Sequence, residues 1–69
     1  MSTSSDLALL SSLGTQLEEL GARITEMAER YGTTPDSALA NELYTAERSL
    51  FGANRALERA RGHLQGMPS

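Results

Sequence analysis

Cysteine, lysine and tryptophan are all absent from this 69-residue chain, and these absences exclude several classes of protein. Without cysteine there is no disulfide framework and no zinc site built on thiolates. The six basic residues are all arginines and face nine acidic residues, which gives a net charge of −3. An acidic chain is a poor match to bulk binding of nucleic acid. The arginine-only usage leads us to expect a bacterial or phage source.

Long hydrophobic runs are also missing. The longest apolar run is Leu7 to Leu10, whereas a membrane-spanning helix needs roughly 20 apolar residues. No basic residue precedes that run, so we expect no signal peptide and a cytoplasmic location. The two prolines mark two breaks in the pattern: Pro35 lies in the one strong internal break, at residues 31–36, and Pro68 lies in the C-terminal stop signal at residues 66–69.

What the chain does contain is two segments with apolar residues at alternating spacings of three and four, the heptad pattern of packed helices. With heptad positions labelled a to g, residues 6–31 carry large apolar side chains at both a and d. The a positions are Leu10, Leu17, Ile24 and Tyr31, and the d positions are Leu13, Leu20 and Met27. Residues 35–65 carry leucine at a and alanine at most d positions. The a positions are Leu43, Leu50, Leu57 and Leu64, and the alanines are Ala46, Ala53 and Ala60.

The break between the segments predicts a short loop. Gly32 is suited to the left-handed conformation that ends a helix. Thr34 is suited to cap the next helix, with Pro35 at its first position and Asp36 favourable to its dipole. A short loop makes the two helices antiparallel. We therefore predict an all-α helical hairpin over 6–65, with helices at about 6–31 and 35–65, a loop at 32–34, and disordered ends at 1–5 and 66–69.

A third row of small residues predicts close helix packing. Gly14, Gly21 and Ala28 recur every seven residues at position e, and a glycine inside a helix costs up to about 1 kcal/mol. Folding at the loop brings together residues whose numbers sum to about 67. This register predicts that Gly21 faces Ala46 and that Gly14 faces Ala53, in a seam whose large layers are formed by Leu10, Leu17, Ile24, Leu43, Leu50 and Leu57.

Charged residues fit the same register. The first half of the chain has a net charge of −3 and the second half is neutral, with four arginines toward its end. Antiparallel folding predicts that these arginines lie beside Asp6, Glu18 and Glu19. Pairs four residues apart, Glu19–Arg23 and Glu26–Arg30, predict weak ion pairs along the first helix.

A lone hairpin of this size buries too little apolar surface to offset the entropy of ordering its residues. We therefore expect a second copy to complete a four-helix bundle, or another protein to cover the same surface. Tyr44 and Phe51 lie seven residues apart, about 100° from the leucine row. The predicted interface residues are Leu13, Leu20, Met27, Tyr44 and Phe51.

Other candidate sites are weaker. His63 is the only histidine and has no acidic neighbour at helical spacing, so we interpret it as a surface residue near a helix end. The glutamates lack the Glu-x-x-His motif of di-iron bundles and are expected to form a solvated face. Arg48, Arg55 and Arg59, together with Gly52, form one stripe that is able to bind an anion, although an outer face paired with acids is the more ordinary reading.

No nucleophile–base pair, metal signature or room for a substrate pocket is evident, so we expect no catalytic, cofactor-binding or metal-binding residues and no enzymatic activity. The expected function is a small interaction or regulatory module that presents a helical face to a partner protein, as a homodimer. The alternative is a regulator that binds a ligand or nucleic acid through the arginine stripe. The two differ in salt dependence, because phosphate binding by arginine weakens steeply with salt.

Overall fold

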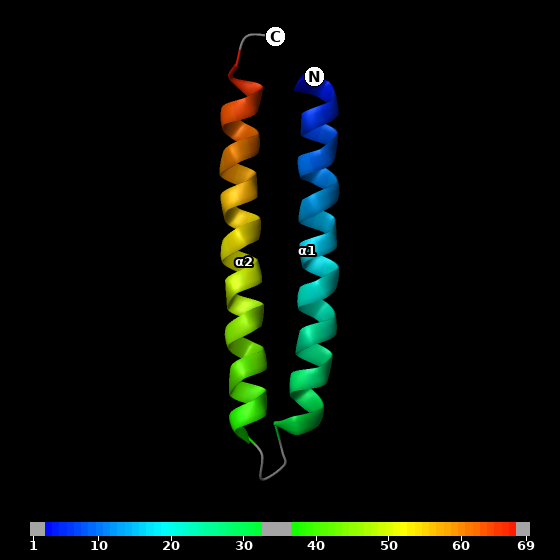
Figure 1. Ribbon diagram of the computed structural model, residues 1–69, viewed down its shortest axis with the longest axis vertical. Helices are drawn as coiled ribbons and strands as arrows, with labels where there is room; N and C mark the ends of the chain where they lie inside the picture. The colour runs from blue at the N-terminus through cyan, green and yellow to red at the C-terminus, as the bar shows by residue number, and fades with distance from the viewer. Residues whose placement is uncertain (1–2, 33–36, 68–69) are drawn as a thin grey trace.

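The chain forms two long helices that pack side by side in opposite directions (Figure 1). The computed structural model describes residues 3–32 and 37–67. Helix α1 spans Thr3–Tyr31 and helix α2 spans Ser37–Gln65. The start of α1 and the end of α2 lie at the same end of the molecule (Figure 1). The predicted all-α antiparallel hairpin is confirmed, and no strand occurs within the described residues.

The helix ends differ from the expected ones in two respects. Helix α1 begins at Thr3, three residues before the expected start, because the first turn leaves its N–H groups free of helical partners and tolerates serine and threonine well. Gly32 is not in the left-handed conformation. A Cβ placed there would lie 3.5 Å from the Ala28 carbonyl oxygen, an ordinary contact for backbone that continues the last turn. The predicted cap at Thr34 and Pro35 lies outside the described residues.

The two helices meet along positions a and e of each heptad. In α1 the buried and half-buried residues fall every three and four positions, and in α2 the same two positions are covered. The covered residues of α1 include Leu10, Gly14, Leu17, Gly21, Ile24 and Ala28. Those of α2 include Ala40, Leu43, Glu47, Leu50, Asn54 and Leu57. The leucine layers are therefore placed as predicted.

The small layers are not placed as predicted, since Ala46 and Ala53 are exposed. A Cβ on Gly14 would lie 3.1 Å from Oδ1 of Asn54, so Gly14 faces Asn54 and not Ala53. The reason is symmetry. Two antiparallel helices are related by a two-fold axis through their contact, so the e row of one helix meets the e row of the other and not its d row. Ala28 and Ala40 are 0% and 3% exposed and form the tightest small layer.

Gly21 departs from the expectation of close backbone approach. The residue is buried, yet a Cβ added there would meet no atom within 4 Å. The same register places Gly21 beside the half-buried Glu47. Close packing therefore holds at Gly14 and Ala28, whereas Gly21 leaves room for a methyl group.

The hairpin buries little. Ala28 and Ala40 are the only fully buried apolar residues in the described part of the chain, and no large side chain there is fully buried. The molecule measures 55 × 14 × 12 Å and exposes 5093 Å². A compact monomer of 7.4 kDa would expose about 4,200 Å². About 900 Å² of surface therefore remains exposed that a compact protein of this mass would cover.

Candidate interaction surfaces

An apolar surface runs along one side of the hairpin at heptad position d. Each residue of a helix is rotated by about 100° from the one before it, so position d lies about 80° to one side of the a/e contact. Because the helices are antiparallel, the d rows of α1 and α2 lie on the same side of the hairpin. We call this surface the d face. Its apolar part comprises exposed Leu13, Leu20 and Met27 of α1, half-buried Leu39 of α2, and exposed Ala46, Ala53 and Ala60 of α2. The d row of α1 also includes half-buried Asp6, one heptad before Leu13.

The side chains of the d face are large on α1 and mostly small on α2. Leu20 exposes 46% of its surface, although its heptad position is typical of a core residue. Ala46 lies at nearly the same height on α2, and Ala53 lies at the height of Leu13. The seven apolar residues form a ridge of large side chains on α1 beside a row consisting mostly of alanines on α2, and Asp6 adds one charge at the N-terminal end of the α1 row.

The aromatic pair lies on the opposite side of the hairpin. Tyr44 and Phe51 occupy position b, about 80° from the a/e contact in the other direction. Tyr44 is half-buried, and Phe51 exposes 49% of its surface. The same side of α1 carries Ser11, Glu18 and Thr25 and is therefore mostly polar. The five predicted interface residues consequently divide between two faces, three on the d face and two on the aromatic side.

Leu9 is an exposed apolar residue that lies outside the a, d and e rows of the heptad pattern. It exposes 57% of its surface and lies at position g, next to the d face. The signal was present in the run Leu7–Leu10, whose four apolar residues are too many for one contact row. Position g also carries Gln16 and Arg23 on α1. On α2 it carries Glu42, Ser49 and Ala56.

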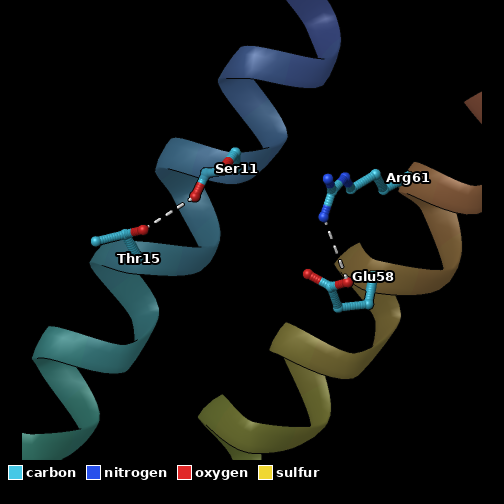
Figure 2. Close-up of polar contacts among 4 residues, drawn as sticks. All are labelled: Ser11, Thr15, Glu58 and Arg61. Carbon is cyan, nitrogen blue, oxygen red and sulfur yellow. Dashed lines mark hydrogen bonds and ion pairs between the residues drawn. The ribbon is translucent and has the colours of Figure 1, made fainter. Parts of the chain in front are cut away.

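The arginine stripe lies on the outer side of α2, away from α1. Arg48, Arg55 and Arg59 are all exposed. Nη2 of Arg48 donates a hydrogen bond to Oγ1 of Thr45 at 3.3 Å. The one ion pair between described residues joins Arg61 Nη1 to Glu58 Oε2 at 3.8 Å, within α2 (Figure 2). The stripe therefore lies open to solvent.

The ion pairs that the sequence predicts are not formed between the described residues. Neither Glu19–Arg23 nor Glu26–Arg30 comes within 4.0 Å, and no arginine of α2 pairs with Asp6, Glu18 or Glu19. Exposed ion pairs gain little free energy and lose side-chain entropy. The antiparallel register is therefore set by apolar contacts and not by charge.

Several threonine hydroxyl groups donate hydrogen bonds within their own helix. Thr15 Oγ1 donates to the Ser11 carbonyl oxygen at 3.2 Å (Figure 2). Thr25 and Thr45 do the same to carbonyl oxygens four residues earlier, each at 3.0 Å. These are the local bonds that serine and threonine form in helix interiors. These bonds therefore do not join the two helices.

Other site features are limited in the described part of the chain. His63 is exposed in the last turn of α2. No group of three potential metal ligands gathers among the described residues, and the described chain encloses no pocket. Neither α1 nor α2 is long and apolar enough to cross a membrane. The chain matches no protein-family model, no curated protein and no solved structure.

Proposed function

We propose that this protein is a non-enzymatic interaction module that works as a homodimer, in which two hairpins form a four-helix bundle and present a helical face to a partner protein. The observation that carries the proposal is the shortage of buried surface. No large side chain is fully buried among the described residues, and the hairpin exposes about 900 Å² beyond a compact monomer. A standard protein interface buries about 800 Å² on each partner. The excess therefore matches the area that one dimer contact would cover.

Sedimentation equilibrium of the purified chain, together with native mass spectrometry, tests the dimer. The expected result is a mass of twice 7.4 kDa at micromolar concentration. Circular dichroism of the same samples reports the helix content. A folded monomer at every concentration would contradict the proposal.

The arginine stripe supports a second candidate function, binding of an anionic ligand or nucleic acid. The supporting observation is that Arg48, Arg55 and Arg59 are exposed and form no ion pair with any described carboxylate. Such groups bind phosphate by charge-assisted hydrogen bonds.

Substitution Arg55→Glu tests this second candidate. With a short fluorescent single-stranded DNA as probe, binding by the native chain should fall steeply with salt, and Arg55→Glu should abolish it without loss of helix content. The matched control is Arg30→Glu, an exposed arginine in the last turn of the other helix. Salt-insensitive binding, or an equal loss in the control, would contradict a role for the stripe.

A further inference from the structure

We propose that the dimer forms through the d face, with the α1 ridge of one copy packed on the α2 alanine row of the other, around a two-fold axis parallel to the helices. This inference rests on the proposed homodimer and adds its geometry. The occupant of the d face is thus a second copy of this chain. Three properties of the d face support this occupant: the sizes of its side chains, its charges and the area that it exposes.

Size complementarity supports this axis. A two-fold axis parallel to the helices keeps every residue at its own height and places α1 of one copy against α2 of the other. Leu20 then faces Ala46 of the second copy, and Leu13 faces Ala53. Near the loop, Met27 faces Leu39, where the flexible methionine side chain is able to adapt. A large side chain thus meets a small one in the two central layers.

The flanking g rows agree with the same arrangement. Leu9 comes beside Ala56 of the second copy and loses its exposure. Gln16 comes beside Ser49, and Arg23 comes beside Glu42. In the g rows, an apolar residue therefore lies beside an apolar one, a polar residue beside a polar one, and a positive residue beside a negative one. These three pairs form only between two hairpins and not within one.

The other two-fold arrangement fits poorly. An axis across the helices would place α1 on α1 and α2 on α2. Leu20 would then face Leu20 of the second copy, and Ala46 would face Ala46 of the second copy. The contact between the two α1 helices would be overpacked, and the contact between the two α2 helices would be underpacked. Leu9 would lie beside Arg30. The aromatic side is no better, because its α1 half carries Ser11, Glu18 and Thr25.

The parallel axis also completes the heptad pattern. Each helix would direct its a and d rows into a common core, with e flanking the contact inside a hairpin and g flanking the contact between hairpins. All neighbouring helices would be antiparallel. Tyr44, Phe51 and the arginine stripe would stay on the outer surface of both copies, where a partner protein is able to reach them.

Disulfide cross-linking tests this geometry directly, because the native chain has no cysteine. Leu20→Cys and Ala46→Cys chains are prepared separately, refolded together and oxidised mildly. We expect about tenfold more cross-linked dimer from the mixture than from either chain alone, since a disulfide needs Cα atoms about 4.4–6.8 Å apart. Helix content, measured for each variant, shows that the chains fold.

A matched control uses the opposite side of the hairpin at a similar height, with Glu18→Cys mixed with Phe51→Cys. This pair should give only background cross-linking. Cross-linking of the control pair, or of Leu20→Cys with itself, would overturn the proposed face or axis. A native chain that sediments as a dimer while no pair cross-links would overturn this geometry alone. A native chain that sediments as a monomer would overturn the homodimer as well.

Discussion

At the scale of single residues, the three e-row positions of α1 differ although the sequence treats them alike. Gly14 lies close to the amide of Asn54, Ala28 is completely buried, and Gly21 is buried beside open space. Spacing along the sequence shows that these residues are small, but it does not show how near the opposite helix comes. The cost or benefit of adding a methyl group therefore differs from one position to the next.

Replacing each of these glycines by alanine should have a different effect on stability. Gly21→Ala should stabilise the protein by about 0.5–1 kcal/mol, because alanine is the better helix former and its Cβ fits without a clash. Gly52→Ala, at an exposed site where a Cβ also meets nothing, is the control for helix propensity alone. Gly14→Ala should gain less than either, because its Cβ would lie 3.1 Å from Asn54 Oδ1. Chemical denaturation of the three variants gives the order, and a gain at Gly14 equal to that at Gly21 would contradict it.

At the scale of the helices, each helix carries one apolar surface that contacts the other helix and a second apolar surface that stays exposed. The a and e rows join α1 to α2, whereas the d rows stay exposed on one side and the aromatic pair on the other. A helix with leucine at both a and d has a stripe wider than one neighbour covers. The second neighbour proposed here is the other copy of the hairpin.

The two sides should therefore respond differently to substitution. Leu20→Ala should weaken the dimer strongly, because two buried leucines are lost per dimer and each costs about 2–5 kcal/mol. Phe51→Ala should change dimer stability by less than about 0.5 kcal/mol, as is usual for surface substitutions. Sedimentation equilibrium of both variants gives the dissociation constant of each dimer. Equal weakening by Phe51→Ala would place the aromatic side in the dimer contact.

At the scale of the whole molecule, shape governs stability. A rod of 55 × 14 × 12 Å has too little interior to bury a large side chain fully. Side chains that are only half-covered contribute a fraction of their transfer free energy. A second hairpin on the d face would turn these half-covered rows into a core.

Folding coupled to dimer formation predicts a melting temperature that depends on concentration. Mass action stabilises a dimer as the chain concentration rises. Thermal melts followed by circular dichroism over a hundredfold range of concentration should therefore shift upward with concentration. Phe51→Ala serves as a control that should show the same slope. A constant Tm would show that the hairpin is stable alone.

Exchange of a large and a small residue tests the packing of the whole dimer. Ala46→Leu alone should overpack the contact with Leu20 of the other copy and cost about 1–3 kcal/mol. The double variant Leu20→Ala with Ala46→Leu should recover much of the loss, because the large and small positions are merely exchanged. The coupling free energy from the double-mutant cycle is the measured quantity. Additive effects would mean that residues 20 and 46 do not meet.

The local sequence pattern is sufficient to specify the two helices, their antiparallel pairing and the leucine layers between them. These follow from the three-and-four spacing and from the break at Gly32 to Asp36, since both act through local geometry and through the shortness of the loop. The first turn of α1 was missed because serine and threonine signal a helix start as readily as a frayed end.

Which side of each helix faces the other depends on how the two helices pack in three dimensions. A stripe formed by positions a, d and e permits a contact through a and d or through a and e. The d rows are the more apolar choice, because the e row of α2 contains Glu47 and Asn54. The helices meet through a and e, where Gly14 and Ala28 allow close approach and Asn54 and Ala40 lie opposite. This contact leaves Leu13, Leu20 and Met27 exposed on one side of the hairpin. It places Tyr44 and Phe51 on the opposite side. The separation of these apolar residues onto two sides arises only when the two helices pack, so the spacing of residues along the chain does not predict it.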